Sequence, residues 1–309
     1  MASIGECMIE LSGATADAGP GPAGEGQMRR GFGGDTLNVA VYARRALPAD
    51  AGAVAYVTSL GEDPFSADML AAWGDEGIDV GLVDRMPGRL PGLYVIVTDA
   101  GGERSFLYWR SASAARETFR ADNAERLSAA LRDYDLVYFS GITLAILDGD
   151  GRARLLDVLR EVRGRGGLVA FDGNYRPRLW HGPDEARFAV SAILPYVSIA
   201  LPTFEDEAAL YGDADAHATA DRLHALGVGE IAVKQGPRPV LLSGPDGREE
   251  VAVPPVARIV DTTAAGDSFN GAYLAARLTG LPPREAAVRG NATAGRVIGL
   301  RGAIIPREG

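Results

Sequence analysis

The regular alternation of apolar runs with helical patterns constrains the fold of this chain more than any other feature. From about residue 121 onward, a helix pattern and a short buried run follow each other repeatedly; they cover 121–131, 136–140, 151–163, 167–172, 184–193, 198–201, 204–211, 218–226 and 230–234. This repetition predicts a three-layer α/β/α fold whose central sheet is mostly parallel and carries helices on both faces. Ligands of such sheets bind at the carboxyl ends of the strands.

Residues 90–109 depart from this alternation. Two runs rich in β-branched and aromatic residues, 93–98 and 105–109, flank the turn Ala100-Gly101-Gly102 and predict a hairpin. We interpret the chain as a single domain, 1–309, with a small β-sheet lid formed from about 11–33 and 88–111. The hairpin is apolar on both of its faces, which a two-stranded unit open to water does not need. One face is therefore expected to cover the substrate, and the other to pack on a second subunit in a homo-oligomer.

Charge and composition narrow the choice of partners. The 309 residues include 41 acidic and 31 basic ones, a net charge of −10, so that nucleic acid and anionic membrane surfaces are not expected partners. No uncharged apolar run reaches about 18 residues, and the first residues lack the pattern of a signal peptide. Cys7, the single cysteine, lies in an apolar run that indicates a buried thiol. A reducing compartment fits this usage, and we expect a cytoplasmic protein.

The stretch Asp261–Phe269 is a loop of small residues that opens a helix pattern, and an apolar run predicts a strand before it. Small residues let the backbone approach a ligand closely, and the free N–H groups of a helix start favour a phosphate. At the start of this helix, the Asp267 carboxylate could take a proton from a substrate hydroxyl. Alternatively, Thr, Asp and Ser at this place are ordinary helix caps, and the local pattern alone does not separate the two interpretations.

A second glycine-containing loop, Gly31–Asn38, also leads into a helix pattern, so Gly33-Gly34 and Asn38 are expected to face the same ligand. By contrast, Gly19–Gly24 has the spelling of a dinucleotide fingerprint but holds two prolines, and no apolar helix follows it. That fingerprint requires a strand–turn–helix context, so we reject an NAD-linked dehydrogenase and interpret the segment as a surface loop.

Metal motifs are weak in this sequence. His181, His217 and His224 are scattered, which predicts no tightly held transition metal. The stretch Asp148–Arg152 begins like a calcium loop, but arginine stands at a ligand position.

Two arginines lie near predicted strand ends. Arg176 follows the strand that ends at Asp172, and Arg110 ends the lid hairpin. Each offers a planar fork suited to a carboxylate, although a surface ion pair is the ordinary role of a single arginine.

Several of these stretches resemble one family. Asp261–Phe269 resembles the C-terminal signature of the ribokinase-like (PfkB-type) carbohydrate kinases, and Gly33-Gly34 with Asn38 resembles their N-terminal signature. Further stretches resemble the subfamily of 2-keto-3-deoxygluconate kinases; these are Ile4–Leu11, Arg89–Tyr94, Tyr108–Arg110, Asn174–Trp180 and Arg301–Arg307. The matching stretches extend over nearly the whole chain.

The resemblance implies an ATP- and Mg²⁺-dependent kinase that phosphorylates the terminal hydroxyl of 2-keto-3-deoxy-D-gluconate. Asp267 would be the general base, and the amides of Ala264, Ala265 and Gly266 would stabilise the transferring phosphoryl group. The residues implied in the substrate site are Gly33, Gly34, Asn38, Tyr94, Tyr108, Arg110 and Arg176. Those implied along the nucleotide are Lys234, Gly236, Thr262 and Asn291.

One departure from the family concerns magnesium. Many members carry an Asn-x-x-Glu motif that organises magnesium-bound water, where this chain has Thr203 and Asp206 instead. No fixed metal ligand is therefore predicted. Two alternatives stay open: a ribokinase- or fructokinase-like kinase of a neutral sugar, and a non-catalytic sensor of sugar and nucleotide.

Overall fold

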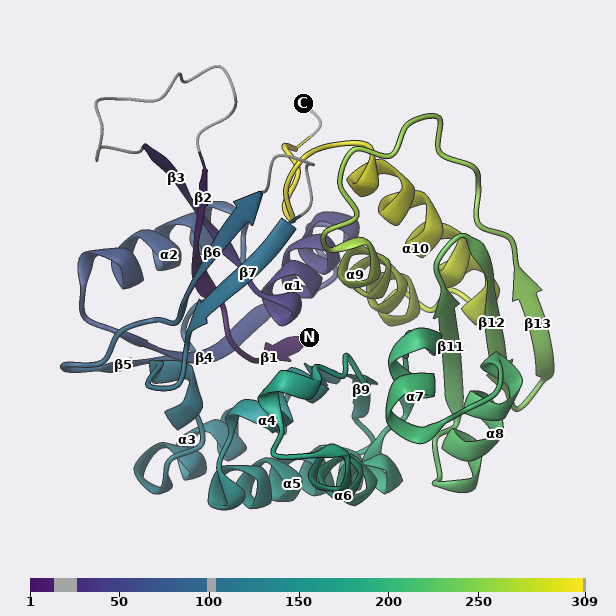
Figure 1. The fold of residues 1–309 in the computed structure, drawn as a ribbon. Helices are drawn as coiled ribbons and strands as arrows, with labels where there is room; N and C mark the ends of the chain where they lie inside the picture. Colours follow the sequence, from purple (N-terminus) through teal and green to yellow (C-terminus); the bar gives the residue numbers. More distant parts are fainter. Residues whose placement is uncertain (14–26, 99–103, 308–309) are drawn as a thin grey trace.

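A nine-stranded sheet forms the centre of the molecule (Figure 1). The computed structural model describes residues 1–13, 27–98 and 104–307. The strand order is β13-β12-β11-β10-β9-β8-β1-β4-β5, and the pairs from β11 to β5 are all parallel, as the sequence predicts. The strands are β1 Ala2–Ile4, β4 Ala55–Gly61, β5 Val83–Met86, β8 Leu136–Ser140, β9 Leu168–Asp172, β10 Ile199–Ala200, β11 Glu230–Gln235, β12 Arg238–Gly244 and β13 Gly247–Val251.

Helices cover both faces of this sheet. Strand β8 shows why, because Val137 and Phe139 enter one apolar core, whereas Leu136 and Tyr138 enter the other. A strand buried on both faces needs a helix layer on each side. The helices are α1 Asp35–Ala46, α2 Pro64–Asp75, α3 Ala121–Leu131, α4 Gly141–Ile146, α5 Gly149–Gly164, α6 Pro183–Ile193, α7 Phe204–Tyr211, α8 Ala216–Ala225, α9 Ala265–Leu278 and α10 Pro283–Ile298.

The two layers are built from different parts of the chain. Apolar residues of α3, α5, α6 and α8 pack on one face, and those of α1, α2, α9 and α10 on the other (Figure 1). Within the second layer, α9 packs between α1 and α10. This arrangement brings helices from the two ends of the chain together beside the carboxyl ends of the strands.

A separate four-stranded sheet has the order β3-β2-β6-β7 (Figure 1). Its strands are β2 Met8–Gly13, β3 Met28–Gly33, β6 Leu93–Thr98 and β7 Arg104–Trp109. The predicted hairpin is confirmed, since β6 and β7 pair antiparallel with Leu93 opposite Trp109. The turn Ala100–Gly102 and the segment Gly19–Gly24 lie outside the described residues.

Two expectations are corrected by the structure, and one element was not predicted. The first run is two strands, β1 and β2, because the chain leaves the large sheet at Ile4 and enters the small one at Met8. Residues 252–260 form no strand before the Asp261 loop. The antiparallel hairpin β12–β13, which the alternation did not predict, ends the large sheet instead.

The burial predicted for Cys7 is confirmed, and two further features concern the helices. The Asp148 side chain accepts a hydrogen bond of 2.7 Å from the Gly151 amide and caps α5, so the stretch that begins like a calcium loop is a helix start. Cys7 is buried, and burial raises the pKa of its thiol. Among the described helices, none has the length and apolar character that a membrane span requires.

Candidate active site

A cavity of about 380 Å³ lies where the small sheet faces the carboxyl ends of β9 and β11 and the start of α9. It gathers most of the residues singled out in the sequence. Those that line it are Gly33, Gly34, Tyr94, Tyr108, Arg176, Lys234, Thr262, Ala264, Ala265, Gly266 and Asp267. Stretches more than 200 residues apart in the chain thus form one pocket.

Asp267 lies in the first turn of α9, half-buried in the cavity wall. Its Oδ2 accepts a hydrogen bond of 2.8 Å from the Asn38 side-chain amide. Burial first, and the carboxylate of Asp35 next, raise the pKa of Asp267 to about 7, although the Asn38 bond acts in the opposite direction. A carboxyl group with such a pKa exchanges protons readily near neutral pH, as a general base requires.

The helix-capping interpretation of this stretch is not supported by the geometry. In the described structure, α9 has Ala264 at its N-cap position and no side chain that caps it. Ala264 has φ of 60°, a left-handed conformation that is costly for a residue with a side chain. Asn174 is the other described non-glycine residue with positive φ, and it lines the same cavity. Strained backbone of this kind concentrates at ligand sites.

The loop before α9 is held by Asp261. Its Oδ1 accepts hydrogen bonds from the amide and the hydroxyl of Thr263, at 3.0 and 2.7 Å. The Ala265 amide donates to the Thr262 carbonyl oxygen at 3.2 Å. One of the three predicted anion-binding amides therefore has a partner within the loop, and an incoming phosphoryl group would compete with it.

A buried polar network lies beneath the cavity. The Lys234 ammonium donates to Asp172 Oδ2 at 2.6 Å and to the Asn270 side-chain oxygen at 3.0 Å. The Asn270 amide in turn donates to Asp172 Oδ2 at 2.7 Å. Buried charges of this kind are stabilised only when each is paired, so Lys234 is held in place by β9 and α9 together. Its predicted contact with the nucleotide remains a prediction.

Arg176 reaches the cavity from just after β9, as its place in the sequence predicts. Its Nη1 donates to both carboxylate oxygens of Asp206, each at 3.1 Å, and to the Tyr175 carbonyl oxygen at 2.9 Å. Burial raises the pKa of Asp206, although the Arg176 guanidinium lowers it. Half of the Arg176 side chain is exposed, so an external carboxylate has access to it.

Aromatic side chains of the small sheet form the opposite wall. Phe106 and Tyr108 stack with ring centroids 6.4 Å apart, and Tyr94 lies 5.9 Å from Tyr108. The Tyr94 hydroxyl donates to the Glu10 carboxylate. A side chain on Gly33 would overlap this hydroxyl, so the small residue leaves room for the tyrosine at the cavity wall.

Four predicted site residues do not line this cavity in the described structure. Arg110 pairs instead with the fully buried carboxylate of Glu6. Asn38 acts on the cavity through Asp267. Gly236, with φ of 62°, follows β11, and the Asn291 amide donates to the Ala252 carbonyl oxygen at 3.2 Å. The ligand contacts predicted for these residues remain predictions.

The sequence-based site left out several lining residues, namely Met8, Asp35, Phe106, Ile142, Asp172, Asn174, Thr203, Asp206 and Thr263. For some a signal was present, because Asp172 and Asn174 end and follow β9, and Asp35 directly follows Gly34. The Asn174 amide donates to Asp35 Oδ2 at 2.7 Å and joins the two loops.

Carboxylates outnumber cations in the cavity wall. Asp35, Asp172, Asp206 and Asp267 line it, against the two cations described above. This donor set fits a hard divalent cation, which prefers oxygen ligands. Yet no three acidic, histidine or cysteine side chains in the described ranges are grouped to hold a metal by themselves. A cation here would need further ligands from water or from a bound phosphate.

The sequence decides which family this architecture represents. Residues 1–308 match the pfkB family carbohydrate kinases. The chain belongs to the pfkB family. A 2-dehydro-3-deoxygluconokinase of Dickeya dadantii is 48% identical over 312 residues, which cover 100% of this chain and 97% of that one. The predicted resemblance to the pfkB family and to 2-keto-3-deoxygluconate kinases is confirmed.

Solved pfkB structures have the same fold. The PfkB protein from Polaromonas sp. JS666 superposes with a TM-score of 0.83 at 26% identity, over 96% of this chain and 95% of that one. Aminoimidazole riboside kinase from Salmonella enterica, solved with aminoimidazole riboside and an ATP analog, gives a TM-score of 0.80 at 23% identity, over 97% and 93%. The predicted three-layer α/β/α fold with a small second sheet is therefore confirmed.

Proposed function

We propose that this pfkB kinase transfers the terminal phosphoryl group of ATP to the terminal hydroxyl of 2-keto-3-deoxy-D-gluconate. The observation that carries the proposal is the position of Asp267. This proton-accepting carboxylate stands at a helix start in a cavity that also presents Arg176, in a chain 48% identical to a 2-dehydro-3-deoxygluconokinase. The cavity thus offers a base, an anion site and a cation in one place.

Each group has a distinct task in this reaction. Asp267 accepts the proton of the attacking hydroxyl, and Asn38 holds the carboxylate in orientation through its hydrogen bond. The first amides of α9 stabilise the charge of the transferring group, as positioned donors do in phosphoryl transfer. Magnesium bound with ATP would neutralise charge on the phosphates, and Asp206, which lines the cavity, would hold it through water.

The substrate carboxylate is bound by Arg176, and the small sheet acts as a lid. The Arg176 guanidinium donates to Asp206 through Nη1, and half of the side chain is exposed. Its other N–H groups can therefore bind a second anion. Tyr94, Phe106 and Tyr108 cover the cavity from the small sheet. Closure of such a cover excludes water, which limits hydrolysis of ATP in place of transfer.

A screen of acceptors tests the substrate assignment. Purified protein with Mg-ATP is offered the keto-acid, fructose and ribose, and ADP formation is followed. We expect kcat/KM for the keto-acid to exceed that for either neutral sugar by about 100-fold, since a site built for a charged group rejects analogues lacking it. Preference for fructose or ribose would replace the assignment with a neutral-sugar kinase. No turnover with any acceptor would favour a sensor.

A further inference from the structure

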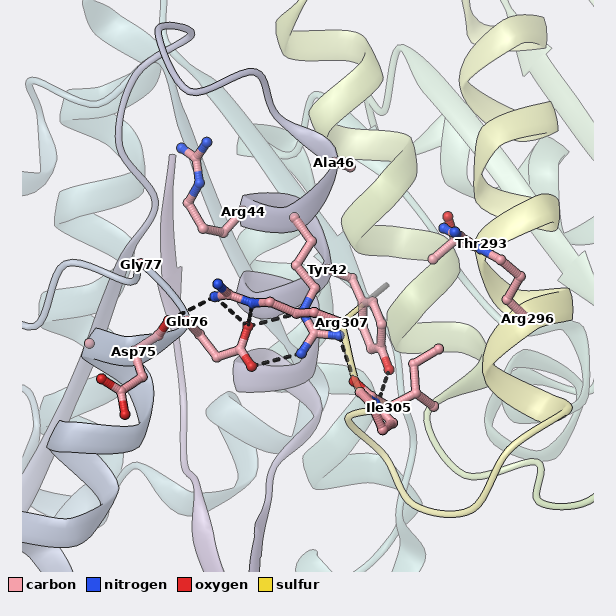
Figure 2. A pocket seen from close by; sticks show the side chains of 13 residues that line it. Tyr42, Arg44, Ala46, Asp75, Glu76, Gly77, Thr293, Arg296, Ile305 and Arg307 are labelled. Carbon is pink, nitrogen blue, oxygen red and sulfur yellow. Dashed lines mark hydrogen bonds and ion pairs between the residues drawn. The ribbon is translucent and has the colours of Figure 1, made fainter. Parts of the chain in front are cut away.

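A second cavity, about 570 Å³ in volume, shares no lining residue with the first. It lies where the ends of α1 and α2 meet α10 and residues 305–307 (Figure 2). Figure 2 shows Glu76 and Arg307 at its centre, where Glu76 forms ion pairs with both Arg307 and Arg45. The reaction described above uses none of these residues.

Glu76 binds two arginines at once. Its carboxylate accepts from Arg45 Nε and Nη2 at 2.9 and 2.7 Å, and from Arg307 Nε and Nη2 at 3.2 and 3.0 Å. Arg45 also donates through Nη1 to the Ile305 carbonyl oxygen at 2.7 Å. The two arginines and Glu76 thus fasten residues 305–307 to α1 and to the end of α2. Geometry of this two-pronged kind is the stronger form of ion pair.

Tyr42 fastens the same segment one turn of α1 earlier. Its hydroxyl donates to the Ala303 carbonyl oxygen at 2.7 Å and accepts from the Ile305 amide at 3.1 Å. Ala303 and Ile305 are both buried against the helices. Residues 302–307, called here the carboxy-terminal segment, are therefore held by hydrogen bonds to Tyr42 and Arg45 of α1 and to Glu76, which directly follows α2.

The other end of the carboxy-terminal segment reaches the active-site loop. The Gly302 amide donates to Asp261 Oδ2 at 3.0 Å, while Asp261 Oδ1 holds the amide and hydroxyl of Thr263. One carboxylate therefore joins the segment to the loop that lines the first cavity and leads into Asp267. A shift of Gly302 would pull on this carboxylate and so on the loop.

We propose that Tyr42 and Glu76 are positioning residues for phosphoryl transfer, acting through the carboxy-terminal segment and Asp261 on the loop before α9. Neither side chain lines the first cavity. The consequence is a specific kinetic pattern, because the loop aligns groups for the transferring phosphoryl while the sugar is bound mainly elsewhere. The proposal rests on the kinase activity proposed above.

Two variants test the connection. Tyr42→Phe keeps the ring and removes both contacts to the segment, and Glu76→Gln removes the charge that holds Arg45 and Arg307. We expect each to lower kcat with the keto-acid by about tenfold while KM changes less than about twofold, since small misplacement remote from the chemistry slows transfer by up to about 100-fold. Hydrogen exchange at the Gly302 and Thr263 amides should accelerate at least about threefold, because local opening becomes easier.

Glu230→Gln is the matched control. Glu230 also binds an arginine two-pronged, Arg277 at 2.9 and 2.8 Å, and accepts from a tyrosine, Tyr273, at 2.7 Å, but it stands at the start of β11. We expect Glu230→Gln to lower Tm about as much as Tyr42→Phe and Glu76→Gln do. Its kcat and the exchange rates of the Gly302 and Thr263 amides should stay at the parent level.

Three results would overturn the proposal: kcat and exchange unchanged in Tyr42→Phe and Glu76→Gln, a change in KM alone, or the same loss of kcat in Glu230→Gln. If the parent lacks keto-acid kinase activity, the proposed function fails. The exchange rates of the Gly302 and Thr263 amides still decide whether Tyr42 and Glu76 act on the loop before α9.

Discussion

Asp267 combines the two properties that a catalytic base needs, a raised pKa and a fixed orientation. Replacing it with Asn removes the charge but keeps the shape and an oxygen that can accept from Asn38. We expect kcat to fall by about 10²–10⁴-fold, the usual contribution of general-base catalysis, with little change in keto-acid affinity. Rapid-quench and calorimetric measurements check both parts. A nearly normal kcat in Asp267→Asn would mean that the carboxylate has no part in proton transfer.

The raised pKa of Asp267 also predicts how pH acts on activity and stability. Because the proposed base works only when ionised, kcat/KM should fall about tenfold per pH unit as pH drops well below 7. The folded pKa lies above the ordinary value of 3.8, so folding favours the protonated form, and stability is lost as pH rises from about 4 to 7. Asp267→Asn should therefore raise Tm, and more at pH 8 than at pH 5. An equal shift at both pH values would contradict the raised pKa.

Arg176 is the residue on which specificity for an acid depends in the proposed reaction. A hydrogen bond to a charged group contributes about 1.5–3 kcal/mol, so Arg176→Ala should lower kcat/KM for the keto-acid by about 10- to 100-fold. A neutral analogue, with the carboxylate reduced to an alcohol, should be a poor substrate of the parent and change far less in the variant. Equal losses on both substrates would indicate damaged folding. Unchanged keto-acid turnover would show that another group binds the carboxylate.

At the scale of elements, the small sheet has two apolar faces with different surroundings. Tyr94, Phe106 and Tyr108 line the open cavity, where Tyr108 is still 49% exposed, and on the other face Leu107 and Trp109 are 50% and 58% exposed. Exposure of so apolar a strand to water is unfavourable, and a contiguous exposed apolar surface often marks an interaction site. We propose that this outer face packs on a second copy of the chain.

Leu107→Asp tests this contact, because a buried unpaired charge would oppose association. Light scattering at micromolar concentration should show a dimer for the parent and a monomer for the variant. Phe188→Asp on α6 is the control: Phe188 is 80% exposed but lies outside the small sheet, so the dimer should persist. A monomeric parent would refute the outer face as an interface.

For the whole molecule, net charge opposes the proposed substrate. The chain carries −10, and four carboxylates line the cavity against two cations. Screening shortens the reach of this field from about 30 Å at 0.01 M salt to about 10 Å at 0.1 M. The association rate of the keto-acid, measured by stopped flow, should therefore rise with salt over this range, while that of the neutral analogue stays constant. A fall for the keto-acid would mean that local attraction by Arg176 outweighs the field of the molecule.

Much of the fold and part of the site follow from the sequence, because both depend on local patterns. Apolar runs that alternate with helix patterns predict a parallel sheet without knowledge of long-range contacts. The helix expected over 204–211 has the predicted bounds. Glycine and small residues at Gly33-Gly34 and at Ala264–Gly266 mark the loops that approach a ligand. Neither loop follows a strand of the parallel sheet; the loops meet in space because they begin α1 and α9, which pack side by side.

Only the tertiary structure decided which polar groups act on one another. The examples are the hydrogen bonds of Asn38 with Asp267, of Lys234 with Asp172 and of Arg176 with Asp206. The residues of each pair are 30 or more positions apart in the sequence, and pairing at such separations leaves no local pattern. The raised pKa of Asp267 has the same origin, since it comes from burial and from carboxylates of other strands and helices. The link from α1 through the carboxy-terminal segment to Asp261 likewise exists only once the two ends of the chain pack side by side.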